Sequence, residues 1–288
     1  MPASSASSPR RMLVCGVMTS STVISFTKLY GTCHKPYLVL ADDYEQYVLK
    51  TQNNKPDKDA IVKEFLCSNL LKTWYIDTPE IASLSLNQSL AENHIFRDDK
   101  TFAMSSVYFG SKYVGLSIDV DKLFTAKSKA TYNLFHNPGI ILDIALFDIW
   151  TENDDRKPSN YNLLFVPFLK GLQIIAIDHA FTFASLPFID INQVRVSFSD
   201  NDSILNIPLA KSIIKRLNIN SEWIHKAEEK FYLCVLKSKE NINKIFESIP
   251  TEFTLNQQER DKIEGFLFSD ERNKIVFDQF KYIISSIK

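Results

Sequence analysis

One polar stretch, residues 153–165 (NDDRKPSNYNLLF), separates two apolar segments and most constrains what this chain can fold into. The segment before it, residues 140–150, is apolar and helix-like. The segment after it, residues 163–178 (LLFVPFLKGLQIIAID), predicts a β-hairpin that turns at residues 170–171 and ends on Asp178. A simple turn needs one or two polar residues, whereas this loop combines two Asp, an Arg and several amides. We therefore expect a loop that handles a charged ligand.

The first half of the chain is typical of strands with one helix. Residues 37–50 (YLVLADDYEQYVLK) predict two strands around an acidic turn, the second ending on Lys50. Residues 61–74 place apolar side chains on one face at helical spacing, with Glu64 beside that face. Residues 96–120 are again strand-like and are interrupted at Gly110.

The second half has helical periodicity from Leu209 onward. Apolar residues of one long segment recur on a single helical face: Phe231, Cys234, Val235, Ile242, Ile245 and Phe246. The pattern predicts an α+β fold, with a small strand-rich first part and a larger, mostly helical second part.

Composition excludes several classes of protein. The net charge of -1 gives no general attraction to nucleic acid or to an anionic membrane. No run of about 18 apolar residues is present, so we expect no membrane span. The four Cys are scattered without a CxxC pair, which indicates a reduced, cytoplasmic chain. Residues 1–20 open with small, polar and basic side chains and are predicted to be a disordered leader.

Five polar residues follow one another in the order that phosphoryl transfer by protein kinases requires: Lys50, Glu64, Asp155, Asn160 and Asp178. In that chemistry a strand Lys holds the α- and β-phosphates of ATP, and a helix Glu pairs with the Lys. A loop Asp orients the attacking hydroxyl, and an Asn five residues later binds Mg²⁺ together with a second Asp. ATP carries about four negative charges, so its Mg²⁺ needs hard oxygen ligands such as these carboxylates and amides.

Each of these residues taken alone has a simpler explanation. A Lys that ends a strand is usually solvated, and an Asp after a strand is often a helix cap. The occurrence of all five on suitable elements and in order favours the kinase interpretation. Spacing favours Asp155 over its neighbour Asp154 as the base, while Asn160 and Asn162 both remain candidates for the metal. Arg156 either anchors a phosphate or supports the loop by pairing with Asp154.

Three segments resemble the HipA-like kinase domain family. The most specific is FDIWTENDDRKPSNYNLLF (residues 147–165) followed by LQIIAIDHAF (residues 172–181). The segment GTCHKPYLVLADDYEQYVLK (residues 31–50) is similar to the first strands of that family, and YFGSKYV (residues 108–114) is similar to its linker. The resemblance covers about residues 22 to 285.

This resemblance implies a bilobal, protein-kinase-like fold with residues 21–110 as the small lobe, containing one helix, and residues 111–288 as the large lobe. Residues 108–111 would form the hinge at the adenine of ATP, and Thr32 would face the phosphates and is a candidate for autophosphorylation. The implied site residues are Lys50, Glu64 and Asp155 for catalysis, Lys50, Thr32, Phe109 and Gly110 for ATP, and Asn160 and Asp178 for Mg²⁺.

The chain also departs from the eukaryotic kinase pattern. It has no G-x-G-x-x-G loop, Arg156 follows the base instead of preceding it, and the metal Asp stands in Asp-His-Ala rather than Asp-Phe-Gly. The resemblance implies a Ser/Thr protein kinase that uses ATP and Mg²⁺. It also suggests a kinase of the toxin type, with a small DNA-binding antitoxin as partner. Two alternatives stay open: a lipid or small-molecule kinase of the same fold, and a non-catalytic nucleotide-binding module.

Overall fold

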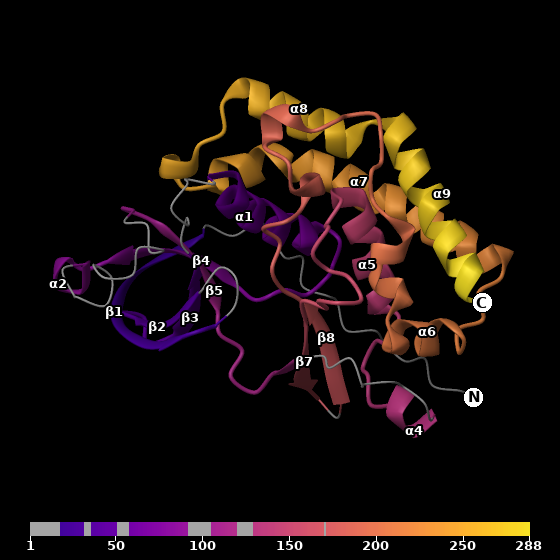
Figure 1. Ribbon diagram of the computed structural model, residues 1–288, viewed down its shortest axis with the longest axis horizontal. Coiled ribbons are helices and arrows are strands. Elements are labelled where there is room, and N and C mark those ends of the chain that lie inside the picture. The colour runs from indigo at the N-terminus through magenta and orange to yellow at the C-terminus, as the bar shows by residue number, and fades with distance from the viewer. Residues whose placement is uncertain (1–17, 32–35, 51–57, 92–104, 120–128, 170) are drawn as a thin grey trace, which may run out of the picture.

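The computed structural model describes residues 18–31, 36–50, 58–91, 105–119, 129–169 and 171–288 (Figure 1). Thr32 and most of the predicted leader therefore lie outside the described residues. Among the residues that are described, no helix combines the length and the apolar character needed to cross a bilayer.

Five strands close into a barrel in the order β1-β2-β3-β5-β4. Neighbours pair antiparallel except β1 and β4, which run parallel. The strands are β1 (Thr19–Leu29), β2 (Tyr37–Ala41), β3 (Gln46–Lys50), β4 (Ile81–Leu86) and β5 (Tyr108–Lys112). Alternate side chains of these strands point inward and form a small apolar core, which includes Val39, Leu49 and Leu84. Lys50 ends β3 and faces Phe109 of β5 in the register.

Helix α1 (Lys58–Thr73) runs between the barrel and the helical part of the chain (Figure 1). It contacts β5 on one side and the long helix α7 on the other. Residues 61–71 are all buried, including the charged Lys63 and Glu64. Because every face of this helix is buried, its polar side chains need hydrogen-bond or ion-pair partners on the neighbouring elements.

The second part of the chain packs helices against a small sheet in the order β6-β7-β8. The strands are β6 (Ile118–Asp119), β7 (Leu163–Phe168) and β8 (Gly171–Ala176). The helices of this part are α4 (Lys129–Tyr132), α5 (Ile140–Thr151), α6 (Pro208–Ile214), α7 (Ser221–Ser248), α8 (Gln257–Phe268) and α9 (Asp270–Ile287). The first part also contains the short helix α2 (Gln88–Ala91). Short 3₁₀ turns lie at Phe183–Ser185, Phe188–Asp190, Asp200–Asp202, Ile204–Asn206 and Thr251–Phe253.

The polar loop lies where the sequence placed it, between the buried helix α5 and the hairpin of β7 and β8. Glu152 ends α5 in a left-handed conformation, with φ 47°, and the chain then turns back toward β7. One large apolar core packs α5 against α1, α7 and α9, so the loop stands on a rigid base.

The predicted α+β organisation is confirmed, with a strand-rich first part and a helical second part. The expectation of one helix in residues 21–110 is not confirmed, because the four-residue α2 follows α1 there. Gly110, the predicted lobe boundary, lies inside β5. The division into two lobes remains a prediction.

Candidate active site

Three predicted residues from distant parts of the chain meet at one point. Lys50 ends β3, Glu64 lies in the middle of α1, and Asp178 follows β8. The ammonium of Lys50 contacts Glu64 Oε1 and lies 2.8 Å from Asp178 Oδ1. The Glu64 side chain is 2% exposed, so this ion pair is shielded from water. The fold thus brings Lys50 into contact with Glu64, 14 residues later in the chain, and with Asp178, 128 residues later.

The pKa values of these three side chains shift in different directions. Burial alone would lower the pKa of Lys50, but the carboxylates of Asp178 and Glu64 outweigh burial and raise it. Burial raises the pKa of Glu64, against the opposing effect of Lys50. Burial would also raise the pKa of Asp178, but the neighbouring Lys50 holds it below its usual range. Asp178 is therefore the more acidic of the two carboxyl groups beside Lys50.

The side chain of Asp155 in the loop binds both amides that are candidates for the metal, Asn160 and Asn162. Its Oδ2 accepts hydrogen bonds from Asn160 Nδ2 at 2.8 Å and from Asn162 Nδ2 at 2.9 Å. Asp154 turns the other way, and its Oδ2 accepts the Ser185 hydroxyl at 3.2 Å. The geometry therefore favours Asp155 over Asp154, whereas Asn160 and Asn162 stay equivalent because both bind the same oxygen.

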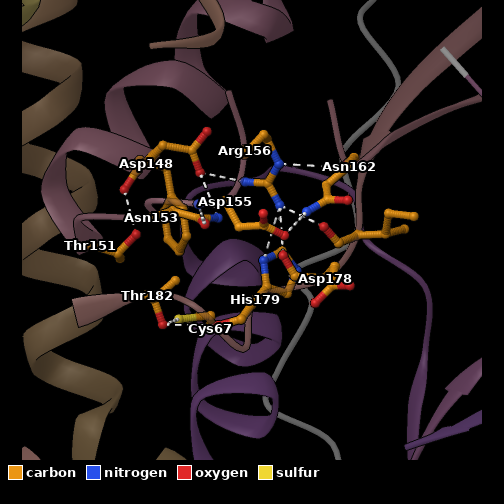
Figure 2. A network of polar contacts seen from close by, with 12 residues as sticks. Cys67, Asp148, Thr151, Asn153, Asp155, Arg156, Asn162, Asp178, His179 and Thr182 are labelled. Atoms are coloured by element: carbon orange, nitrogen blue, oxygen red, sulfur yellow. Dashed lines mark hydrogen bonds and ion pairs between the residues drawn. The ribbon is translucent and has the colours of Figure 1, made fainter. Parts of the chain in front are cut away.

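Arg156 connects the loop to its surroundings, as Figure 2 shows. Its side chain is fully buried and donates from Nη1 to Asp148 of α5. Nε donates to the carbonyl of Asn162 at 3.3 Å, and Nη2 donates to that of Ile177 at 2.7 Å. Nη2 also lies 3.1 Å from His179 Nδ1. Arg156 thereby ties α5, the loop and the end of β8 together.

This arrangement answers the question left open for Arg156. It supports the loop, but its partner is Asp148 and not Asp154, because Asp154 points toward Ser185. Since the guanidinium is buried and engaged, it is not exposed to a bound phosphate.

The backbone turns sharply at the end of β8. Asp178 has φ 61°, a left-handed conformation that is uncommon outside glycine and is often found at functional sites. The turn directs the amide of His179 toward α1, where it donates to Glu64 Oε2 at 3.1 Å. The imidazole of His179 is buried beside Arg156, and burial together with that charge lowers its pKa well below 6.5. The ring is therefore neutral and packs behind Asp178.

Two residues assigned to ATP by the resemblance, Phe109 and Gly110, lie within β5. The Phe109 ring is buried edge-on against Phe65, with 4.9 Å between ring centroids. A Cβ on Gly110 would lie 2.6 Å from the Leu84 side chain, so a larger residue here would have to displace Leu84. Any contact of these two residues with adenine would have to come from their backbone. Thr32, which the resemblance also assigned to ATP, lies outside the described residues.

The oxygen groups at the site suit Mg²⁺ better than a soft metal. Asp178 supplies a carboxylate, and Asn160 and Asn162 use their nitrogens on Asp155, so their amide oxygens are the atoms that would hold a cation. In the described part of the chain, no three His, Cys, Asp or Glu gather to hold a metal. Mg²⁺ does not need such a cage, because it usually binds one or two protein oxygens and the phosphates of its substrate.

One supporting ion pair, between Glu152 and Arg272, went unassigned in the sequence. Glu152 forms a fully buried ion pair with Arg272 of α9 at 2.9 Å and also accepts the Ser197 hydroxyl. A usable signal was present, because an acid inside or directly after the apolar run 140–150 needs a buried cation when its side chain faces the core. Asp148 and Glu152 both fit that description, with Arg156 and Arg272 as their respective partners.

Comparison with known proteins supports the kinase interpretation. The sequence model of the HipA-like kinase family matches residues 26–276 of this chain. The crystal structure of a Helicobacter pylori proinflammatory kinase, CtkA, is similar with a TM-score of 0.54 and 13% identity, over 94% of this chain and 100% of that chain. At this identity the likeness shows the fold alone, and it confirms the kinase-like fold predicted above.

Two structures of the Golgi casein kinase are more distant. One has a TM-score of 0.46 and 12% identity, over 93% of this chain and 74% of that chain. The other, with Mn/ADP bound, has a TM-score of 0.44 and 11% identity, over 93% of this chain and 72% of that chain. No curated protein matches the sequence significantly.

Proposed function

Because the chain belongs to the HipA-like kinase family, we propose that it transfers the γ-phosphate of ATP to a hydroxyl group in the presence of Mg²⁺. We further propose that the acceptor is a Ser or Thr side chain of a protein. The observation that carries this proposal is the convergence of Lys50, Glu64 and Asp178, together with Asp155 and its two amides on the neighbouring loop.

In this proposal each residue has a physical task. Lys50 places a fixed positive charge against the α- and β-phosphates, and Glu64 keeps its side chain extended. Asp178 and one of the two amides, Asn160 or Asn162, would hold Mg²⁺, which would neutralise charge that develops on the phosphate oxygens. Asp155 would accept a hydrogen bond from the acceptor hydroxyl and orient it in line with the γ-phosphate.

The contact between Lys50 and Asp178 joins two groups that the proposal assigns to the phosphates and to the metal. When the phosphates and the metal bind, Lys50 has new anionic partners and Asp178 has a new cation, so the direct contact can be exchanged for them. Glu64 keeps its second oxygen on the amide of His179 and so holds its place on α1 during this exchange.

The non-catalytic alternative is less well supported, because every one of these positions carries a competent side chain in contact with its expected partner. A lipid or small alcohol acceptor would suit a basic surface, whereas the chain has a net charge of -1. The toxin-type role, the antitoxin partner and the cytoplasmic location stay predictions of the resemblance and of composition.

The proposal is tested by thermal unfolding of the wild type with ATP, with and without Mg²⁺. We expect a stabilisation that requires Mg²⁺ and that Asp178→Ala abolishes relative to its own baseline. Asp278→Ala, on an exposed ion pair of α9, is the matched control and should keep the shift. If ATP and Mg²⁺ do not change the unfolding temperature of the wild type, the result would favour the alternative that the protein does not bind nucleotide.

A further inference from the structure

Helix α1 carries a row of polar or thiol side chains at positions 59, 63 and 67. Asp59, Lys63 and Cys67 are four residues apart and so lie on one face of the helix. We call these three residues the polar row. All three contact the segment that follows Asp178, residues 182–188.

The contacts of the first two residues are made to backbone atoms. Asp59 Oδ2 accepts the amide of Phe188 at 2.8 Å. Lys63 Nζ donates to the carbonyl of Leu186 at 2.7 Å and lies 5.7 Å from the centre of the Phe188 ring. Lys63 is only 3% exposed, although a buried Lys is rare and normally requires a partner. These two side chains therefore fix the path of the backbone at residues 186–188.

The same helix binds the start of the segment. The thiol of Cys67 lies 3.4 Å from the hydroxyl of Thr182, and Glu64 accepts the amide of His179 at 3.1 Å. Glu64 is also the residue that contacts Lys50. The position of α1, which sets the Lys50–Glu64 contact, is thus coupled to the segment through three side chains, and Glu64 adds a contact to His179 just before it.

The segment needs such support because its backbone is strained. Phe183, Ala184 and Ser185 have φ values of 58°, 53° and 57°, so three successive residues are left-handed without a glycine. Such conformations persist only where the surroundings hold them. On its other side the segment contacts the loop, since the Ala184 amide donates to the Glu152 carbonyl at 3.0 Å.

A phosphorylated side chain in residues 182–188 would also hold this segment in place if a cation were available to bind the phosphate. The Arg that follows the loop Asp is not available, because Arg156 is fully buried and its nitrogens bind Asp148, backbone carbonyls and His179. The polar row of α1 makes direct contacts to the segment instead.

We propose that Asp59 and Lys63 are positioning residues that hold residues 182–188 against α1, so that the Lys50–Glu64–Asp178 group is assembled in the unphosphorylated chain. The kinetic part of this inference rests on the proposed phosphotransfer. The structural part, the ordering of the segment by α1, does not depend on it.

Two measurements on the full chain test the inference. Hydrogen exchange of residues 179–190, without nucleotide or metal, should be faster in Asp59→Ala and in Lys63→Met than in the wild type, because each loses a backbone contact. Phosphate transfer should show kcat lowered about tenfold to a hundredfold, with a smaller change in KM for ATP, because the reacting groups are misplaced. Asp59→Asn keeps an acceptor and Lys63→Arg keeps a donor, so both should recover most of the loss.

The control is Lys58→Met, which removes an ion pair of α1 with Glu259 of α8 at 3.4 Å and leaves the segment untouched. It should match the wild type in both measurements. Phosphatase treatment of the wild type should leave kcat unchanged. Unchanged exchange in both variants, unchanged kcat despite faster exchange, or loss of activity after phosphatase treatment would each overturn the proposal. A wild type without transfer would refute the proposed function, and the exchange data would still decide whether α1 orders the segment.

Discussion

Arg156 and Asp148 form an ion pair in which neither side chain is more than 1% exposed. The pair joins the loop that carries Asp155 to helix α5, which lies in the main core. Because both charges are buried, each depends on the other for compensation. The geometry of the candidate active site therefore depends on an arginine that does not itself face a substrate.

Arg156→Met should destabilise the chain strongly, since it leaves Asp148 as an uncompensated buried charge. We expect a loss of about 3–5 kcal/mol in the free energy of unfolding, measured by urea denaturation. The double variant Asp148→Leu/Arg156→Met removes both charges and should recover part of this loss. Equal stability of Arg156→Met and the wild type would contradict the supporting role.

The second buried pair, Glu152 with Arg272, anchors the start of the same loop to α9. Arg272→Met should cost about 3–5 kcal/mol for the same reason. Lys281→Met breaks an exposed pair with Asp278 on the same helix and should cost less than about 1 kcal/mol. If both variants lost a similar amount of unfolding free energy, the buried Glu152–Arg272 pair would contribute no more to stability than the exposed pair.

Stability should also depend on pH through His179. Burial and the neighbouring Arg156 lower the pKa of this imidazole well below 6.5 in the folded chain. Below pH 6.5 the unfolded chain binds a proton at this residue and the folded chain does not, so the free energy of unfolding falls as pH falls. The limiting slope for one group is about 1.4 kcal/mol per pH unit.

The variant His179→Gln isolates this contribution, because it can still accept from Arg156 but does not titrate. We expect the stability difference between wild type and variant to shrink or reverse by this slope between pH 6.5 and 5, measured in urea with a chelator present. Parallel curves for the two proteins over that range would mean that His179 becomes protonated in the folded chain without penalty.

Much of the fold could be predicted from periodicity and from residue order. The apolar run 140–150 predicted α5, and the two apolar stretches on either side of residues 170–171 predicted the β7–β8 hairpin that precedes Asp178. The six apolar residues predicted to share a face on α7 are all buried. Local patterns suffice here because each face meets a single core.

Contacts between distant segments were harder to predict. The sequence left two partners open for Arg156, a phosphate or its neighbour Asp154, but the fold brings in Asp148 from the preceding helix instead. The burial of Lys63 was not anticipated, because a Lys on a helix is usually solvated and nothing local indicates that residues 182–188 will cover it. Phe109 was assigned to a hinge from a motif, which stays a prediction, and the packing of its ring against Phe65 was not anticipated.

The central claim is that Asp155 orients the acceptor of a phosphate supplied by ATP. The most direct test is transfer of labelled γ-phosphate from ATP with Mg²⁺, to the chain itself and to general protein acceptors, by wild type, Asp155→Ala and Asp154→Ala. Asp154 is the matched control, because it is the adjacent acid and points to Ser185. We predict that Asp155→Ala lowers the rate at least about a hundredfold while Asp154→Ala stays close to the wild type. Equal rates in the wild type and Asp155→Ala would contradict the account.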